Sequence, residues 1–450
     1  MNSDRTTITE AAQEVPVIAE TDVCVLGGSC TGVFAAVRAA RLGRSVVLVE
    51  KTNAFGGVAT NGLVCAWHSF YDTRFERQII GGLSADTAER LEKRGALIRL
   101  EKNPHMGCRF NSEELKIELD EVVLANGVRP MLHTSFCAPV LENGSVDAVL
   151  VENKDGRGAI RAGVFVDATG DGDLVAQCGL PFAVDARLQA PTTCAKIRNF
   201  PAKDFNYREL YSKHHREFGL EADSGWDCGI PGLPGLRMVA QTHVYGADCS
   251  DADPLTQAEI TGRRQIRAIM DMIRKYGPAG TNISLAALPA YIGIRETRRF
   301  EAEYELKEDD VLWGRRFEDA VAQGSYRVDV HHPEGGGFLF KYLDGTMSDH
   351  TAAGSTRGRW RDPIEEDPTF YQVPYRTMVH RDVKNVIMAG RMISADRGAF
   401  GAIRVMVNLN QTGEAAGVAA SLALQNGIHV KDVDPAVLRK SLVDGGSILL

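Results

Sequence analysis

The chain has 450 residues, 44% of them hydrophobic, and a net charge of −8. This length exceeds what one hydrophobic core usually serves, so two or more domains are expected. The acidic balance argues against a nucleic-acid partner or an anionic membrane surface, both of which need a basic face. No run approaches the ~20 apolar residues that span a bilayer, and the polar start lacks the apolar core of a signal peptide. We therefore expect a cytoplasmic protein that binds neither membranes nor nucleic acids.

The nine cysteines are scattered along the chain. They form neither a C-x-x-C pair nor the paired cysteine and histidine spacing of a zinc site. We expect buried, reduced thiols and no metal site, and the missing cysteine pair weighs against a disulfide reductase.

Residues 1–20 are predicted to form an N-terminal arm that ends in an edge strand. The next stretch, residues 22–50, has the pattern strand, glycine turn, helix, strand. A short apolar run ends in Gly27 and Gly28, and Gly32 opens a helix whose alanines allow close packing on a sheet. The unpaired amides and the positive dipole at such a helix start favour a pyrophosphate. This pattern predicts a dinucleotide-binding unit.

Two further positions refine this unit. Glu50 follows the second strand, where a carboxylate would hold a ribose diol. Ser29 occupies the middle glycine position of a G-x-G-x-x-G pattern counted back from Gly32. A serine hydroxyl can donate a hydrogen bond there, so we expect nucleotide binding to survive this departure.

The next segments follow in chain order. A glycine-rich connection with Gly56 and Gly57 is too apolar for an ordinary exposed loop, and its glycines allow close approach of a bound cofactor. Helices are predicted near residues 77–94 and 111–125, the second with Ser112 as N-cap, and strands at 129–133, 138–142, 146–153 and 159–166.

Two later strand ends repeat the cofactor-facing pattern. The strand that ends near residue 166 runs into Gly170 and Asp171, and a buried strand at 385–391 ends in Gly390 and Arg391. A small-residue helix predicted at 412–425 offers a third helix N-terminus to a ligand.

Residues 181–371 are irregular, apart from a helix predicted at 258–276 and a strand at 290–305. We predict a discontinuous nucleotide-binding domain, residues 21–180 and 372–450, with residues 181–371 inserted as a substrate-binding domain.

Together these motifs resemble the FAD-dependent oxidoreductase (FAD_oxidored) family, within the glutathione-reductase-like flavoproteins. The matching segments are 56–64, 165–173, 292–299, 371–376, 389–394 and 413–417, and the resemblance spans residues 22 to about 442. It implies an α/β fold: a Rossmann-like FAD-binding domain, with a parallel sheet and helices, plus an inserted α+β substrate domain. The run 408–412 departs from the family pattern near the expected flavin ring.

The resemblance implies FAD as the cofactor and assigns it a set of contacts. The first glycine turn would hold the pyrophosphate, Glu50 the adenosine ribose, and Gly390 with Arg391 the phosphate and ribityl chain. The helix near Gly413 would face the flavin C2 carbonyl. The residues expected to bind FAD are Gly27, Gly28, Ser29, Thr31, Gly32, Glu50, Lys51, Gly56, Gly57, Thr60, Gly170, Asp171, Gly390, Arg391 and Gly413.

Asp329 and His331 are candidate catalytic residues. Alternation in an extended segment places both on one face, and a carboxylate beside an imidazole raises the basicity of the imidazole. The alternative is a surface pair of His331 and His332 in the loop before Pro333.

Arginines supply the other candidates. Arg404, alone in an apolar, glycine-rich stretch, needs a partner and is our preferred catalytic contact. Arg295, Arg298 and Arg376 are candidate substrate-binding residues, because a guanidinium binds a carboxylate bidentately or polarises a carbonyl. The alternative for residues 295–305, where arginines alternate with glutamates, is a set of ion pairs. For Cys65, His68 and Cys194, core packing or ordinary loop contact is favoured over a redox role or covalent FAD.

We expect an FAD-dependent dehydrogenase or reductase that exchanges a hydride between flavin N5 and a small organic substrate. Since no second glycine fingerprint suggests an NAD(P)H domain, the electron partner is expected to be an external acceptor or donor, or O₂. The alternatives are an FAD-dependent monooxygenase and a non-catalytic flavin-binding or sensor protein. A homo-oligomer is left open.

Overall fold

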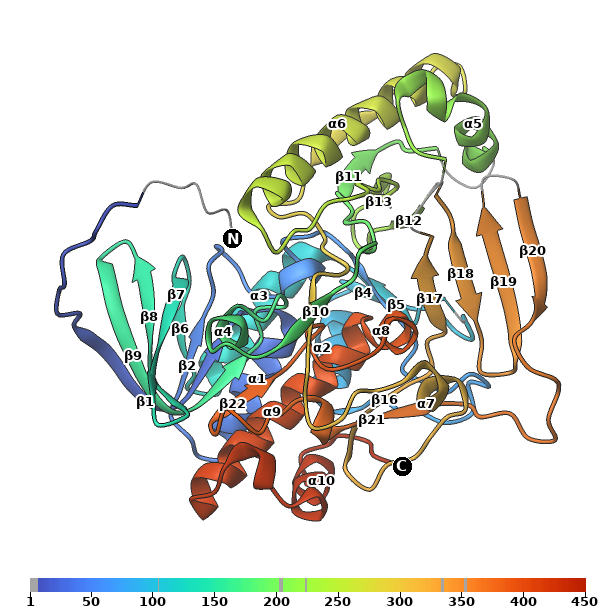
Figure 1. Ribbon diagram of the computed structural model, residues 1–450. Coiled ribbons are helices and arrows are strands. Elements are labelled where there is room, and N and C mark those ends of the chain that lie inside the picture. The colour runs from blue at the N-terminus through green and yellow to red at the C-terminus, as the bar shows by residue number, and fades with distance from the viewer. Residues whose placement is uncertain (1–6, 104, 202–204, 223–224, 333–335, 352–353) are drawn as a thin grey trace.

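The computed structural model describes residues 7–103, 105–201, 205–222, 225–332, 336–351 and 354–450. Its main sheet has seven strands and lies on the left of Figure 1. The strand order is β6 (Arg129–Met131), β2 (Val46–Val49), β1 (Val17–Leu26), β9 (Gly156–Asp167), β8 (Ser145–Asn153) and β7 (Ser135–Glu142), and β22 (Val386–Met388) also pairs with β9.

The sheet is parallel where it carries the site. β6, β2, β1, β9 and β22 run parallel, whereas β8 pairs antiparallel with the first half of β9. All four residues of β2 and the last four of β1 are buried, as expected for parallel strands that are covered on both faces. The predicted α/β class with a parallel sheet is confirmed.

Two helices that are distant in sequence pack closely beside this sheet: α1 (Cys30–Arg41) and α9 (Met406–Asn426). Glycines on α9 make the contact possible. A Cβ at Gly413 would lie 2.0 Å from the carbonyl oxygen of Thr31, and one at Gly417 would lie 2.1 Å from that of Ala35. Any side chain at these two positions would force the helices apart.

A second group of elements lies at the top of Figure 1. A four-stranded sheet with the order β12 (Trp226–Gly229), β13 (Leu236–Ala240), β11 (Ala195–Arg198) and β14 (Ser284–Ala287) packs with α5 (Tyr207–His214) and α6 (Ala252–Tyr276). These elements share a separate hydrophobic cluster, in which Ile197, Val239 and Ile269 are fully buried.

A third group, on the right of Figure 1, is an antiparallel sheet in chain order. Its strands are β17 (Val328–His331), β18 (Phe338–Lys341), β19 (Thr346–Thr351) and β20 (Gly354–Arg359).

Further helices and strands complete the described chain. They are β3 (Ala66–Trp67), α2 (Gly82–Lys93), β4 (Leu97–Arg99), β5 (Cys108–Phe110), α3 (Ser112–Ala125), α4 (Asp173–Gln177), β10 (Phe182–Val184), β15 (Arg298–Phe300), α7 (Glu308–Leu312), β16 (Ala320–Gly324), β21 (Tyr371–Pro374), α8 (Arg397–Ile403), α10 (Pro435–Asp444) and the 3₁₀ helices η1 (Gly57–Ala59), η2 (His215–Phe218), η3 (Tyr375–Thr377) and η4 (Val430–Asp432).

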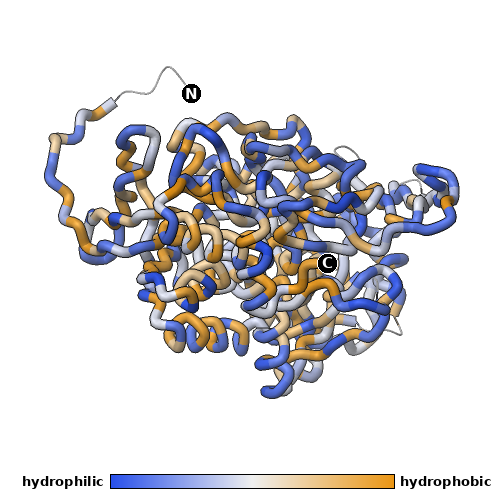
Figure 2. The backbone as a smooth tube through the Cα atoms, turned by 90° about the horizontal axis from the view of Figure 1, so that it is seen from below, coloured by the Kyte–Doolittle hydropathy of each residue, from blue (hydrophilic) through white to orange (hydrophobic). Residues whose placement is uncertain are grey.

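Residues 7–14 are exposed and extend from the body of the molecule, where the tube of Figure 2 leaves it at one side. β1 then begins at Val17 and continues without a break through the expected edge strand into the glycine turn. None of the described helices has both the length and the apolar character that a membrane span requires.

The structure corrects several element boundaries. Asn111, not Ser112, caps α3, and α6 begins at Ala252. The strand predicted at 290–305 is wrong, because only Arg298–Phe300 forms a strand there. α9 begins at Met406, six residues before the predicted start.

The main hydrophobic core extends past the predicted domain boundary. Phe300, Leu306 and Val321, from the segment assigned to the inserted domain, belong to the same buried cluster as Val23 of β1. The division at residues 181 and 371 therefore stays a prediction, and part of that segment shares the core of the nucleotide-binding sheet.

Candidate active site

A cavity of about 1400 Å³ opens where the parallel strands end. Its walls include Leu26 and Val49, the last residues of β1 and β2, and Ala168 and Ala389, which follow β9 and β22. Open parallel sheets bind ligands outside the carboxyl ends of their strands. From there the cavity continues to the inner face of β17–β20.

The first glycine turn holds the start of α1 against this cavity. Ser29 is the N-cap of α1, and its Oγ accepts a hydrogen bond from the Gly32 amide at 3.4 Å. The sequence predicted Ser29 as a donor to a ligand. In the structure its oxygen first satisfies the helix start, as N-cap serines do, while Ser29 still lines the cavity.

Glu50 is buried, and it also lines the cavity. Its carboxylate accepts hydrogen bonds from the amides of Gly28, at 2.7 Å, and Thr52, at 2.8 Å. Because a carboxylate offers about four acceptor positions, capacity for a ribose hydroxyl remains.

Gly56 and Gly57 approach the first turn as well as the cavity. The Gly56 amide donates to the carbonyl of Gly28 at 2.8 Å, and a Cβ at Gly57 would lie 2.8 Å from the Cβ of Ser29. Both glycines have positive φ and line the cavity. Their close approach therefore joins two turns that face one ligand space.

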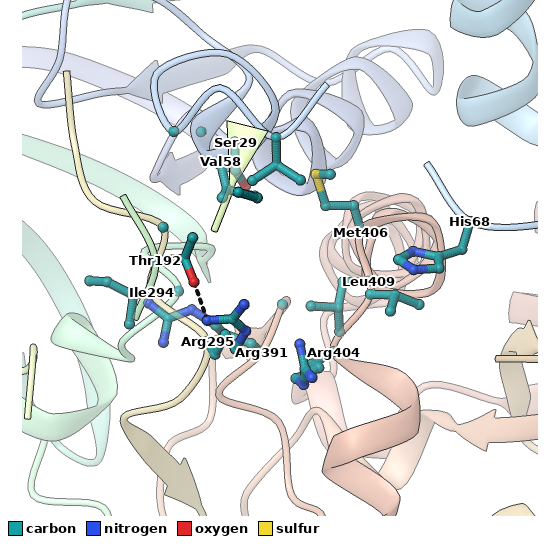
Figure 3. A pocket seen from close by; sticks show the side chains of 18 of the residues that line it. Ser29, Val58, His68, Thr192, Ile294, Arg295, Arg391, Arg404, Met406 and Leu409 are labelled. Carbon is teal, nitrogen blue, oxygen red and sulfur yellow. Dashed lines mark hydrogen bonds between the residues drawn. The ribbon is translucent and has the colours of Figure 1, made fainter. Parts of the chain in front are cut away.

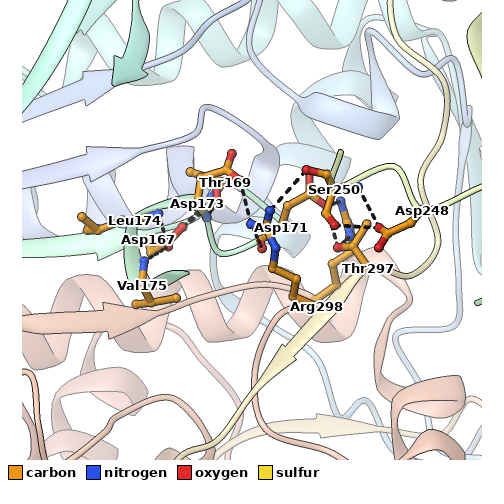
Figure 4. A network of polar contacts seen from close by, with 11 residues as sticks. Asp167, Thr169, Asp171, Asp173, Leu174, Val175, Asp248, Ser250, Thr297 and Arg298 are labelled. Atoms are coloured by element: carbon orange, nitrogen blue, oxygen red, sulfur yellow. Dashed lines mark hydrogen bonds and ion pairs between the residues drawn. The ribbon is translucent and has the colours of Figure 1, made fainter. Parts of the chain in front are cut away.

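The end of β9 is fixed by a polar network around Asp167 (Figure 4). This fully buried carboxylate accepts hydrogen bonds from the amides of Thr169, Leu174 and Val175, which hold the turn and the start of α4. Burial raises the pKa of Asp167 to about 6. Its role is structural, because it orders the turn that carries Gly170 and Asp171.

Asp171 and Arg391 join two strand ends across the cavity wall. They form an ion pair, the Thr297 hydroxyl donates to Asp171 at 2.7 Å, and Arg391 donates to that hydroxyl at 2.9 Å. Both charged residues line the cavity. Asp171 and Arg391, which were each predicted to bind FAD, are thus brought together from positions 220 residues apart.

Lys51 lies at the same end of the cavity, with its Nζ 4.8 Å from the centre of the Tyr291 ring. Burial disfavours its charge, but Tyr291 and the nearby carboxylates of Asp173 and Asp171 outweigh burial and raise the pKa of Lys51. Lys51 therefore stays cationic and is suited to a phosphate.

Four of the residues predicted to bind FAD lie outside the lining of the cavity. Gly28, Gly32, Thr60 and Gly413 do not line the cavity. Gly32 and Gly413 allow close backbone packing, and the Thr60 hydroxyl donates to the Phe55 carbonyl at 2.6 Å.

The sequence predicted that the helix α9 would contact the cofactor near Gly413. In the structure, the part of α9 that lines the cavity is its first turn. Met406, Leu409 and Asn410 line the cavity there. No capping residue marks this start in the sequence, because the N-cap is Val405, whose side chain has no group that could cap the helix.

Asp329 and His331 do share one face of β17. The His331 Nε2 lies 3.9 Å from Asp329 Oδ1, and both line the cavity. Arg404 Nη2 lies 3.4 Å from Asp329 Oδ2, to which the Tyr326 hydroxyl also donates at 2.6 Å. Although burial opposes ionisation, the charge of Arg404 lowers the pKa of Asp329 far below its usual range.

The expected rise in the basicity of His331 is wrong. Burial, with the charge of Arg295, lowers the pKa of His331 well below its ordinary value, and this outweighs Asp329. His331 is therefore a neutral imidazole, with a buried Nδ1 that no described residue binds. Sequence reasoning missed Tyr326 and Arg327, although Arg327 is two residues from Asp329 and so shares its face.

His68 lines the cavity beside Tyr326, and the two ring centres are 4.3 Å apart. Burial lowers the pKa of His68 to about 3, so this imidazole is also neutral. Cys194 lines the cavity, whereas Cys65 lies behind the wall, and all nine cysteines are free.

Of the predicted substrate arginines, only Arg295 lines the cavity. Figure 3 shows Ser29, Val58 and Met406 on one side of this space, with Arg295, Arg391 and Arg404 on the other. Arg295 donates to the hydroxyl of Thr192 and to the carbonyl of Ala190.

The structure does not support a substrate role for the other two. The Arg298 guanidinium is bound to the Asp173 carboxylate at 3.3 Å and to the Ser250 carbonyl at 3.2 Å. Arg376 has a half-exposed side chain that pairs with Asp319 at 2.9 Å, away from the cavity.

The residues present fit FAD. Besides the three strand ends and the start of α1, the cavity wall holds Asn61, whose buried Oδ1 has no partner among the described residues. A Cβ at Gly390 would meet only the Met392 sulfur, at 3.8 Å, so the backbone there is open to a ligand. Ser29, Glu50 and Lys51 would hold the dinucleotide, with Asp171 and Arg391 beside it.

Comparison with known proteins agrees with this fit. A family model described as FAD dependent oxidoreductase matches residues 22–442. A search of curated proteins found no match.

The solved structures that resemble this chain are distant. A geranylgeranyl bacteriochlorophyll reductase-like protein from Thermoplasma acidophilum is 12% identical, with 94% of this chain and 82% of that chain covered and a TM-score of 0.45. A triple mutant of the flavin-dependent brominase Bmp2 is 13% identical, with 94% and 85% covered and a TM-score of 0.45. The p-nitrophenol 4-monooxygenase PnpA from Pseudomonas putida DLL-E4 is 12% identical, with 95% and 84% covered and a TM-score of 0.45.

The family match extends over most of the chain, and it confirms both the predicted family and the predicted cofactor. The protein belongs to the FAD dependent oxidoreductase family and is an FAD-dependent enzyme.

Proposed function

We propose that the protein is a dehydrogenase or reductase that exchanges a hydride with a small organic substrate bound beside Asp329 and Arg404. When bound, FAD supplies the two-electron acceptor or donor. The observation that carries the proposal is the group formed by Arg404, Asp329, His331 and Arg295, which lines the same cavity as the dinucleotide-binding turns.

Arg404 is the residue best placed to hold a substrate oxygen. Its side chain is 13% exposed, and one guanidinium nitrogen lies 3.4 Å from Asp329. Its Nε has no hydrogen-bond partner among the described residues. A fixed guanidinium with unused donors binds a carboxylate or polarises a carbonyl, and Asp329 is then a positioning residue for Arg404.

His331 and Arg295 complete this end of the cavity. Since His331 is neutral, it can donate a hydrogen bond from one ring nitrogen and accept one at the other. Arg295 adds a second positive charge, which favours substrates that carry or develop negative charge on oxygen. We propose an external electron partner.

Anaerobic spectroscopy of the holoenzyme tests this function. Small hydroxy acids, amino acids and alcohols are offered to oxidised enzyme, and keto and unsaturated acids to enzyme reduced with dithionite. A compound that bleaches or restores the flavin band without O₂ supports the proposal. Hydroxylation of a product only in the presence of O₂ would establish a monooxygenase instead, and ligand binding without any redox change would establish a binding protein.

Variants then locate the chemistry. Arg404→Gln is expected to slow flavin reduction about 10²-fold, the usual loss for one preorganised donor, and Arg404→Lys to recover part of it. Arg216→Gln removes an exposed arginine outside the cavity and is the control. Equal rates in Arg404→Gln and Arg216→Gln would remove Arg404 from the site.

A further inference from the structure

The inner face of β17–β20 is a wall of the cavity built from cross-strand rows. In one row Asp329 pairs with Phe340, Phe340 with Ser348, and Ser348 with Arg357. Directly opposed residues in an antiparallel sheet project from the same face. All four residues of this row line the cavity, so the wall runs from the proposed reaction site on β17 outward to β20.

This wall and the elements beside it carry a surplus of positive charge. Arg327, Arg357 and Arg208 of α5 all line the cavity. No described carboxylate forms an ion pair with any of the three. The acids nearby are already engaged, since Asp227 pairs with Arg237, and Asp349 contacts His332 at 2.6 Å.

All three arginines lie near enough to His350 to act on its charge. His350 follows Ser348 by two residues on β19 and faces the same cavity. Burial and the charges of Arg208, Arg327 and Arg357 lower the pKa of His350, although Asp349 opposes them. All three guanidinium groups therefore act on a single imidazole, in a chain whose overall charge is −8.

Aromatic side chains cover the sheet between the two ends of the cavity. Phe338 and Phe340 lie on the same face of β18, with ring centres 4.7 Å apart and an interplanar angle of 27°. The Arg327 guanidinium lies 3.9 Å from the centre of the Phe340 ring. Stacking holds this cation in place without neutralising its charge.

We propose that the substrate is an organic anion with a planar or apolar body. Its carboxylate or phosphate binds among Arg208, Arg327 and Arg357, its body lies on Phe338 and Phe340, and its reacting end reaches Arg404. The position of the reacting end rests on the proposed function. Three strand spacings separate Asp329 from Arg357, so the anionic group lies within roughly 14 Å of the reacting end.

Binding to the oxidised holoenzyme, measured by equilibrium dialysis, tests this inference. The probes are 4-phenylbutyrate, its neutral amide, and phenyl phosphate. We expect the acid to bind at least about tenfold tighter than the amide, the typical gain from one charge-assisted contact, and added salt to weaken the acid but not the amide. Tighter binding of phenyl phosphate than of the acid would identify a phosphate substrate, and the reverse order a carboxylate.

Charge variants at the wall give the second measurement. Arg327→Gln and Arg357→Gln are each expected to weaken 4-phenylbutyrate about tenfold and to leave the amide unchanged. Arg216→Gln, which removes the same charge outside the cavity, is expected to change neither. Equal affinity for acid and amide, no binding of either anion, or an equal loss in Arg216→Gln would overturn the inference.

The two proposals fail separately. Anion binding without any redox change of the flavin would sustain the anion site and overturn the proposed function. Flavin reduction by neutral compounds in an enzyme that binds no anion would sustain the proposed function and overturn the anion site.

Discussion

His331 is a residue whose charge state depends on burial more than on its closest carboxylate. Asp329 lies 3.9 Å away, but its charge is already balanced by Arg404. Desolvation then dominates, and the pKa of the imidazole falls well below its ordinary value of 6.5. The local pattern D-x-H suggested the opposite, because a sequence shows the neighbours on one strand and not the arginines that arrive from other elements.

This charge state predicts how stability depends on pH. Unfolded His331 takes up a proton below pH 6.5 and the folded residue does not, so stability is present above that pH and is lost as the pH falls below it. We expect His331→Gln to reduce this loss by up to about 1.4 kcal/mol per pH unit below 6.5. Urea unfolding of the unchanged protein and of His331→Gln at pH 7, 6 and 5 measures this loss of stability.

The exposed His429 provides the control for this measurement, as His429→Gln. If His331→Gln and His429→Gln changed the pH dependence equally, His331 would titrate as an ordinary surface histidine.

At the scale of the elements, the contact between α1 and α9 fixes the start of α1 where the dinucleotide would bind. Gly413 meets the backbone of Thr31 within the first turn of α1. We expect Gly413→Ala to lower the free energy of unfolding by about 1–3 kcal/mol, the usual cost of overpacking, and to reduce the FAD content. Urea unfolding and the flavin-to-protein absorbance ratio measure the two effects.

Gly229→Ala serves as the matched control, because the Cβ would meet nothing closer than the Arg109 side chain at 3.6 Å. Equal stability of the two variants would show that α1 and α9 separate without cost.

The elements also show which parts of the fold the sequence could predict. Continuous apolar runs such as Val46–Val49 correctly predicted the parallel strands, and the glycine turn correctly predicted α1. The alternating arginines and glutamates after residue 295 indicated ion pairs, and such pairs form, as between Arg299 and Glu296. The strand predicted for the same segment is mostly absent, because ion pairs of this kind also form in an irregular segment.

The candidate site was predictable to the extent that its parts are local. Asp329, His331 and Arg404 were found from short patterns, and all line the cavity. Arg208 and Arg357 were missed because cross-strand pairing and helix packing, which bring them to the same wall, leave no pattern in a single sequence. The pairing of Arg376 with Asp319 outside the cavity was not foreseen for the same reason, since Asp319 is 57 residues away.

At the scale of the whole molecule, one buried ion pair joins the two ends of the sequence. Arg38 of α1 donates to the carbonyls of Ser441 and Leu442 at 3.1 and 3.2 Å. Its Nε lies 3.8 Å from Glu414 of α9, which accepts from the Leu83 amide at 3.0 Å. Four helices, α1, α2, α9 and α10, therefore meet at this pair.

Glu414 makes the stability depend on pH with a sign opposite to that of His331. Burial raises its pKa to about 7, whereas an ordinary glutamate has a pKa of 4.5. The folded protein retains a proton that the unfolded chain releases, so this contribution to stability is present below pH 4.5 and is lost as the pH rises to 7. We expect Glu414→Gln to remove a decline of up to about 1.4 kcal/mol per pH unit between these values.

Urea unfolding across pH 5 to 8 tests this prediction against Glu365→Gln, a change at an exposed carboxylate. A difference between Glu414→Gln and the unchanged protein that stays constant over the range would contradict it.

The wall of β17–β20 has a consequence for engineering. Alternate residues of each strand project from the same face of this sheet, and the strand ends that would hold FAD belong to a different sheet. A combinatorial library that varies only cavity-facing positions of this sheet, such as Phe338, Phe340, Ser348 and Arg357, would change substrate specificity. The residues proposed to bind FAD would stay unchanged. In such a library, flavin colour reports which clones fold, independently of what they convert.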